Sequence, residues 1–192
     1  MTATAVHVPM TEESPETPPC TRPPLRLALV PAGSAPARID GAWWPYSRDL
    51  TAELPALIDV LDKRWDRITH ITVNPTHWPV IPHKVQGNGH VVKVGWFKEE
   101  QDPHQLMLLS YRVGRWDLLV IPPQTPPATA AWLQAAAADP LRTSTGSQLM
   151  AEAGRRADEE ARDTSQAVWD SEGGHAGRIG AAMPLDAAKK VA

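Results

Sequence analysis

Cysteine is almost absent from this chain, whose single thiol, Cys20, lies in a proline-rich segment near the amino terminus. One cysteine cannot form an internal disulfide, and it cannot supply the paired thiolates of a CxxC zinc site. Such sparing use of cysteine fits a reducing compartment, so we expect a cytoplasmic protein.

Long apolar runs are missing as well. No run approaches the roughly 20 residues that a membrane-spanning helix needs. The first residues, MTATAVHVPMTEESPETPP, have neither the basic region nor the apolar region of a secretory signal. We therefore expect neither export by this route nor a membrane partner.

The chain also lacks an excess of positive charge where a folded domain is expected. From residue 25 to residue 139 it has 11 lysines and arginines against 11 aspartates and glutamates. A neutral domain attracts phosphate only weakly, which argues against a nucleic-acid partner.

Catalytic signatures do not occur either, since GxSxG, GxxxxGK[ST], GxGxxG and HExxH are all missing. The histidines of the central region are irregularly spaced and have no cysteine beside them, which is not typical of a metal site. We expect no cofactor, no bound metal and no catalytic residue of a known pattern.

Composition divides the chain into three parts. Residues 1–24 hold six prolines and show no hydrophobic period, so we expect a disordered N-terminal tail. Residues 25–140 carry the periodic apolar segments and are predicted to form a single α+β globular domain. Residues 141–192 are predicted to form a C-terminal helix with a thin apolar stripe, followed by a flexible tail.

The spacing of apolar residues predicts a mainly antiparallel sheet of five or six strands flanked by two helices, with an extra C-terminal helix and disordered tails. Because Pro55 is tolerated only in an opening turn, the regular body of the first helix is expected to begin near residue 53. That helix has its apolar face at Leu54, Leu57, Ile58, Leu61 and Trp65. The second helix is expected to stop at Asp139. Strands are predicted in segments 25–30, 38–44, 67–73, 90–97, 106–111 and 116–121, the last two joined as a hairpin.

Four motifs carry a resemblance to known sequences: GAWWPYSRDL, NPTHWPVIP, HVVKVGWF and QDPHQLMLLSYRVGRWDLLVIPP. In this order they resemble an actinobacterial domain-of-unknown-function family (DUF5994-like), over roughly residues 25–140. The resemblance implies the limits of the domain. It implies no catalytic residue, cofactor or partner, because the family's function is unassigned.

Tryptophan is abundant where phenylalanine is scarce, with eight tryptophans against one phenylalanine in the chain. Trp65, Trp96 and Trp132 lie on apolar faces of predicted elements, which indicates core packing. Trp43 and Trp44 are adjacent in a predicted strand and must point to opposite faces, so one is expected to meet the helices and the other to face outward or under a loop.

The outward indole, together with tryptophans in loops and after the hairpin turn, is the best candidate for stacking on a ligand or partner. The alternative is that these rings cover the edge of the core. Arg48 could anchor a polar ligand or pair with Asp117, while Asp49 beside it is expected to cap the first helix. The candidate binding residues are Trp43, Trp44, Arg48, Asn74, His77, Trp78 and Trp116.

These observations favour a non-enzymatic cytoplasmic binding or regulatory module with a tryptophan-rich recognition surface, whose partner is a protein or a small ligand. An alternative is a metal-dependent or hydrolytic enzyme that uses His77, Asn74 and Asp117 around the proline-rich loop. A third is an RNA-binding sheet with stacked aromatics, which the neutral domain disfavours. The oligomeric state is left open by the sequence.

Overall fold

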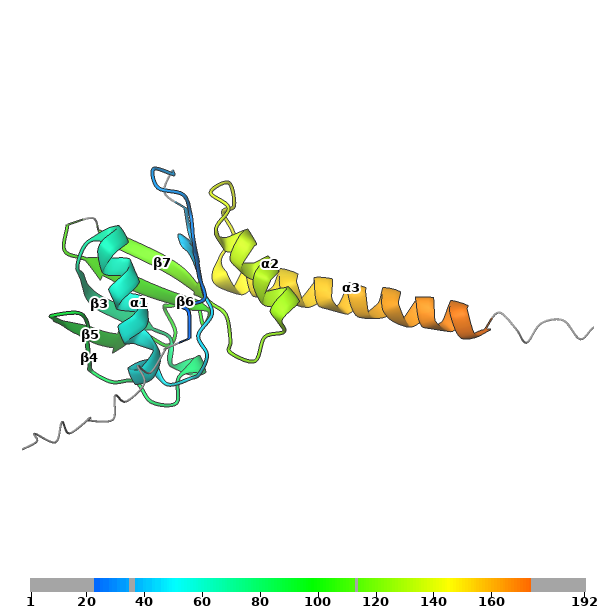
Figure 1. Ribbon diagram of the computed structural model, residues 1–192, viewed down its shortest axis with the longest axis horizontal. Coiled ribbons are helices and arrows are strands. Elements are labelled where there is room, and N and C mark those ends of the chain that lie inside the picture. The colour runs from blue at the N-terminus through cyan, green and yellow to red at the C-terminus, as the bar shows by residue number, and fades with distance from the viewer. Residues whose placement is uncertain (1–22, 35–36, 113, 174–192) are drawn as a thin grey trace, which may run out of the picture.

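The computed structural model describes residues 23–34, 37–112 and 114–173, and the side chains up to residue 169. These residues form a seven-stranded sheet with three α-helices, which confirms the expected α+β class (Figure 1). The strands are β1 (Leu27–Leu29), β2 (Gly41–Trp43), β3 (Ile68–Val73), β4 (Lys84–Gln86), β5 (Val91–Trp96), β6 (Gln105–Ser110) and β7 (Arg115–Val120). The helices are α1 (Leu50–Trp65), α2 (Pro127–Ala137) and α3 (Gly146–Gly173), with a short 3-10 helix η1 (Pro75–His77). The predicted tails fall largely outside the described residues.

The strands lie in the order β1-β2-β7-β6-β3-β5-β4. Four neighbouring pairs are antiparallel, as expected, whereas β2 with β7 and β3 with β5 are parallel. The β6–β7 hairpin occupies the centre of the sheet. The sheet has one strand more than the largest number expected, because β4 forms within a segment predicted as a loop. Its three residues are too few to show an alternating pattern.

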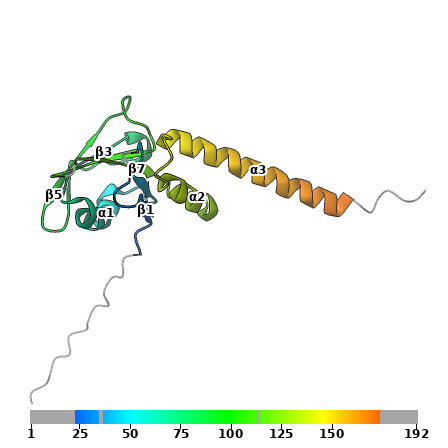
Figure 2. The ribbon, with the colours of Figure 1, turned by 90° about the horizontal axis from the view of Figure 1, so that it is seen from above.

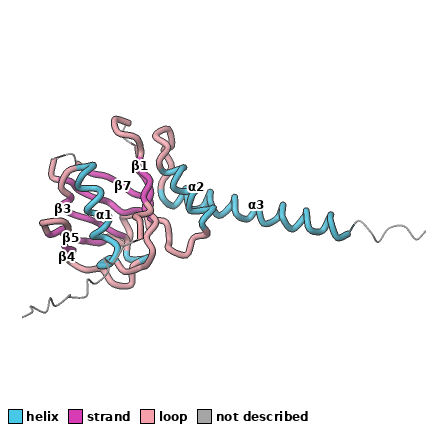
Figure 3. Tube along the Cα trace, in the orientation of Figure 1, coloured by secondary structure: helices cyan, strands magenta, loops and turns pink. Residues whose placement is uncertain are grey.

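Alternation along the central strands builds two apolar cores on opposite faces of the sheet. Leu118 and Val120 of β7 join the cluster under α1, whereas Leu119 between them joins the cluster under α2 and the start of α3. Figure 2 and Figure 3 show α1 over one half of the sheet and α2 at the other end, beside β1. The face opposite α1 therefore has helical cover only where α2 and α3 reach it.

Helix α1 forms as its sequence pattern predicts, because all five residues of the expected apolar face are buried. Asp49 caps it, since its side-chain oxygen accepts the Thr51 N–H at 2.9 Å. The helix begins at Leu50, three residues before the predicted start, so Pro55 lies beyond the opening turn and removes one backbone hydrogen bond.

Within the described residues, helix α3 contacts the rest of the domain through its first half. Leu149 and Ala153 are buried against α2, and the Asp102 carboxylate accepts hydrogen bonds from Ser147 N–H and Oγ–H at 2.8 and 2.7 Å. Beyond these contacts the helix projects away from the sheet (Figures 1 and 2). No helix in the described residues combines the length and the apolar character needed to cross a membrane.

Candidate functional site

The adjacent tryptophans point to opposite faces, as predicted. Trp43 is fully buried in the α1-side core and stacks on Trp78, with 5.8 Å between ring centroids and 18° between planes. Trp44 is half-buried and packs against the α2-side core. Trp43 and Trp78 therefore fill the interior in this structure and present no recognition surface.

Trp44 is covered by a cation. The Arg26 guanidinium lies 3.6 Å from the centroid of the Trp44 ring and 3.9 Å from that of Tyr46. It also donates hydrogen bonds to the carbonyls of Trp44 and Pro45. These contacts give the WWPY segment a packing role, because they clamp the turn between β2 and α1 onto β1.

Asn74 and Arg48 occupy different environments. Asn74 is buried, and its side chain caps η1 while donating to the carbonyls of Lys98 and Gln101 at 3.0 and 2.8 Å. Its polar atoms are thus used in holding two loops together. Arg48 is exposed, and its charge acts on the imidazole of His77.

One of the three tryptophans predicted to pack in the core lies outside it. Trp65 is buried as expected, but Trp96 is 47% exposed, so its prediction as a core residue was wrong. It is the last residue of β5 and packs on the His83 ring, with 5.5 Å between centroids. Trp132 is half-buried beside α3, with the guanidinium groups of Arg142 and Arg156 over its ring.

His77 lies against His104, with 4.5 Å between the ring centroids. His77 Nε2 and His104 Nδ1 are buried without a hydrogen-bond partner among the described residues. Burial lowers the pKa of both imidazoles, and the neighbouring charges of His104 and Arg48 lower the pKa of His77 further, whereas Asp102 opposes both shifts. Burial alone would raise the pKa of Asp102, but hydrogen bonds from Ser147 and from the His104 N–H outweigh it. Both imidazoles therefore resist protonation more than a free histidine does, beside the anchor of α3.

This pair predicts a loss of stability in mild acid. An unfolded histidine takes up its proton near pH 6.5, whereas both imidazoles resist protonation in the folded chain. The unfolded state then binds more protons, so the free energy of unfolding is highest above about pH 6.5 and falls as the pH drops below it. Urea denaturation at pH 7.5 and 5.5 measures the difference, with the His77→Gln, His104→Gln double variant as control. An equally steep dependence in that variant would assign the effect to other groups.

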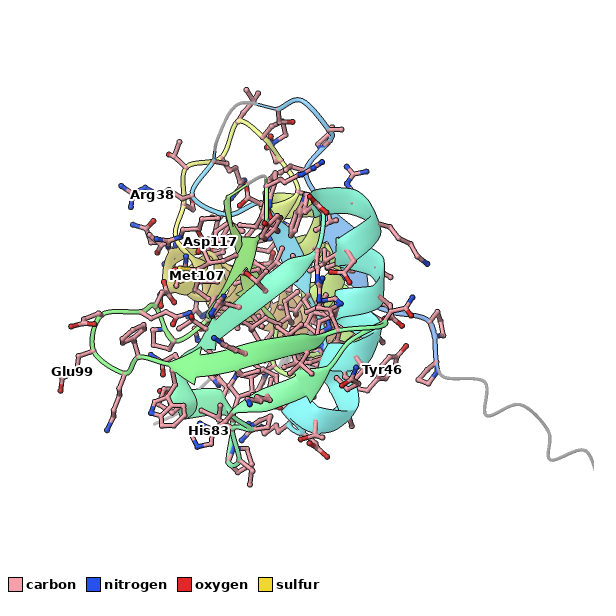
Figure 4. The ribbon with its side chains drawn as sticks, turned by 90° about the vertical axis from the view of Figure 1, so that its left-hand side faces the viewer. Arg38, Tyr46, His83, Glu99, Met107 and Asp117 are labelled. Carbon is pink, nitrogen blue, oxygen red and sulfur yellow. The ribbon has the colours of Figure 1, made fainter. Side chains whose placement is uncertain are left out.

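His77 and Asp117 do not share a site. The Asp117 carboxylate accepts hydrogen bonds from Arg115 and from Gln105 Nε2, and no hydrogen bond or ion pair joins it to His77. Figure 4 shows Asp117 beside Met107 on the sheet, in the upper part of the view, whereas His83 lies near the lower edge. Among the described residues no group of three or more His, Cys, Asp or Glu side chains could hold a metal ion.

The open face of the sheet bears on the RNA-binding alternative. Strand register places basic side chains in one row across it, interrupted by one leucine: Lys84, Lys93, His70, Leu109 and Arg115. Among the tryptophans of the strands, Trp43 and Trp116 belong to the opposite, α1-side face. The row offers charge without the aromatic platform typical of RNA-binding sheets, and the RNA alternative stays a prediction.

A cavity of about 430 Å³ lies where the end of α1, the start of β7 and the segment after β1 meet. The indoles of Trp65 and Trp116 form one wall, stacked with 4.3 Å between centroids and 3° between planes. Val30, Pro31 and Ala37 add aliphatic surface. Of the predicted binding residues, only Trp116 lines this cavity.

Asp40 places a buried carboxylate in the cavity wall, with 9% of the residue exposed. Its Oδ2 accepts the Asp117 N–H at 2.8 Å, and its own N–H donates to the Asp117 carbonyl at 2.7 Å. Burial raises the pKa of the Asp40 carboxyl, and the hydrogen bond from Asp117 offsets this only in part. The second oxygen has no hydrogen-bond partner among the described residues, so it is free to accept one from a ligand.

Two guanidinium groups border the same cavity. Arg115 forms a bidentate pair with Asp117, through Nε–Oδ2 at 2.8 Å and Nη2–Oδ1 at 3.0 Å. Arg64 is exposed and donates to the Val30 carbonyl at 3.1 Å. Asp40 is therefore the buried charge of this cavity, and it has no ion-pair partner in the described part of the chain.

The sequence offered a weak signal for this site. Asp40 is the one acidic residue in the predicted strand segment RIDGAWW, and a carboxylate beside buried strand residues needs a hydrogen-bonding partner. The partner, Asp117, is 77 positions away, and no local pattern connects the two.

Most of the domain matches a known protein family. A family model described as a family of unknown function (DUF5994) matches residues 26–137, which is more than half of the chain. The chain belongs to the DUF5994 family. No match was found among curated proteins or among solved structures. The DUF5994 region runs from Arg26, which clamps the WWPY turn, to the last residue of α2, and it contains every described residue of the cavity wall. Helix α3 follows the region.

Proposed function

We propose that this DUF5994 domain is a non-enzymatic binding module that takes a small organic ligand in the cavity between α1, β7 and the segment after β1. The observation that carries the proposal is the combination of stacked indoles and a buried carboxylate in one cavity of about 430 Å³. Ligand sites are typically concave and mostly apolar, with a few polar groups that fix orientation. The binding function expected from the tryptophans is kept, and its place moves from the WWPY segment to Trp65 and Trp116.

Binding is favoured over catalysis by the groups in the wall. The described lining residues include no imidazole or thiol, and the Ser34 hydroxyl donates to the Pro31 carbonyl within its own turn. The described wall therefore offers no thiol nucleophile, and its one serine hydroxyl is held by a backbone carbonyl. We propose a cytoplasmic location on the single cysteine, and the actinobacterial origin suggested by the motifs stays a prediction.

The indole N–H signals of the eight tryptophans provide a direct test. A library of small aromatic and aliphatic compounds is screened by two-dimensional ¹H–¹⁵N NMR, with Trp65 and Trp116 assigned through their phenylalanine variants. We expect ligands to shift these two signals first, because both rings line the cavity.

The matched control fills the cavity. Ala37→Phe places a ring in the cavity wall, whereas Ala151→Phe adds the same ring on the exposed surface of α3. Ala37→Phe is expected to abolish the shifts and Ala151→Phe to leave them. Shifts that survive Ala37→Phe would place binding elsewhere and refute the proposal.

A further inference from the structure

We infer that the ligand of this cavity is a small organic amine whose ammonium group binds the Asp40 carboxylate. The inference rests on the proposed function, because it names the chemical class of ligand for the same cavity. Asp40 is then the residue that determines specificity.

Asp40 carries the inference through its burial and its free oxygen. Only 9% of the Asp40 residue is exposed, one carboxylate oxygen accepts the Asp117 N–H, and the other has no hydrogen-bond partner among the described residues. A buried charge is costly until it is paired and hydrogen-bonded. An ammonium group supplies both the opposite charge and N–H donors. A hydroxyl can also donate a hydrogen bond to the carboxylate, but it brings no charge.

The indoles favour the same ligand class. Trp65 and Trp116 present aromatic surface to the cavity in which Asp40 lies. Aromatic rings attract organic cations through their electron-rich faces and also pack against an apolar ligand body. An amine with an aromatic or aliphatic body therefore finds complementary groups at both of its ends.

The two guanidinium groups at the border of the cavity, Arg115 and Arg64, do not make it prefer an anion over an amine. Arg115 is held by its bidentate pair with Asp117, and its effect on the pKa of the Asp40 carboxyl is smaller than those of burial and of Asp117. Arg64 is exposed, where water screens its charge, and one of its nitrogens already donates to the Val30 carbonyl. A ligand anion would meet Arg64 only at the solvent-exposed border and would face the buried carboxylate inside.

Three probes with the same phenyl body separate the possible head groups: 2-phenylethylamine, 2-phenylethanol and 3-phenylpropionate. Isothermal titration calorimetry with the full chain at pH 7 gives each affinity. We expect the amine to bind at least about tenfold tighter than the alcohol, because both can donate a hydrogen bond to the carboxylate but only the ammonium adds an opposite charge. The carboxylate probe is expected to bind most weakly.

The variant Asp40→Asn keeps an oxygen that can accept the Asp117 N–H and removes the buried charge, so it is expected to fold. In this variant the amine should lose about tenfold in affinity, while the alcohol, which loses only the charge assistance of its hydrogen bond, loses less. Retained alcohol binding and a melting temperature no lower than that of the parent chain show that the cavity is intact.

The outcomes separate this inference from the proposed function. Equal affinity for amine and alcohol, tightest binding of the carboxylate, or no effect of Asp40→Asn on the amine overturns the amine class. So does an absence of binding by all three probes. In each case the proposed function stands as long as library compounds still shift the Trp65 and Trp116 signals, and it falls with the inference when they do not.

Discussion

Replacing Trp43 by alanine is expected to lower the free energy of unfolding by about 3–5 kcal/mol, the range for removing a fully buried large aromatic side chain. Trp43 has no exposed surface, belongs to the α1-side core and stacks on Trp78. Its removal leaves a cavity that Trp78 and the surrounding leucines cannot close without moving. Guanidinium denaturation followed by circular dichroism measures the loss.

Trp44→Ala is the matched control, because it removes the same side chain one position along the strand. Trp44 is half-buried, and its main contact outside the α2-side core is the Arg26 guanidinium. We expect a loss of no more than about 2 kcal/mol, the upper range of a cation–π contact with some apolar burial. Equal losses for the two variants would contradict the assignment of Trp43 to the core.

Gly41→Ala is expected to lower the free energy of unfolding by about 3 kcal/mol or more, through a backbone clash combined with backbone strain. A Cβ at Gly41 would lie 2.2 Å from the Ala28 carbonyl oxygen and 2.9 Å from Leu29 Cα, and the glycine has φ of +153°. These atoms belong to β1, which pairs with β2 at this position. The clash therefore separates the two strands or distorts both.

Gly95→Ala provides the comparison for that variant. Gly95 also lies in a strand, but a Cβ there meets no atom within 4 Å. Its substitution is expected to change stability by no more than about 0.5 kcal/mol. Both variants are compared by urea denaturation, and a cost at Gly41 as small as that at Gly95 would show that β1 shifts freely.

The local parts of the fold could be predicted from the sequence because their causes are local. The spacing of Leu54, Leu57, Ile58 and Leu61 determines which face of α1 is buried, and the structure buries these residues. Trp43, the last residue of β2, and Trp44 directly after it point to opposite faces, as alternation predicts. Which of them points to α1 depends on the pairing of β2 with β7, which lies more than 70 positions away.

The cavity could not be predicted for the same reason. It needs Trp65 at the end of α1, Trp116 in β7 and Asp40 before β2 to meet, and each has a satisfactory local explanation alone. Trp65 resembles an ordinary core residue, and Asp40 resembles an ordinary polar residue near the start of a strand. Parallel pairing of β2 with β7 brings Asp40 to Asp117, and sequence periodicity carries no information about that pairing.

The projecting part of α3 affects how the protein moves in solution. At a rise of about 1.5 Å per residue, the part of α3 beyond its contacts with α2, residues 161–173, forms a rod of roughly 20 Å that contributes little mass. A rod of this kind increases friction and advances elution from a sizing column. An elution volume interpreted with compact standards would then overstate the mass of a monomer, so subunit number is better determined by light scattering or sedimentation equilibrium.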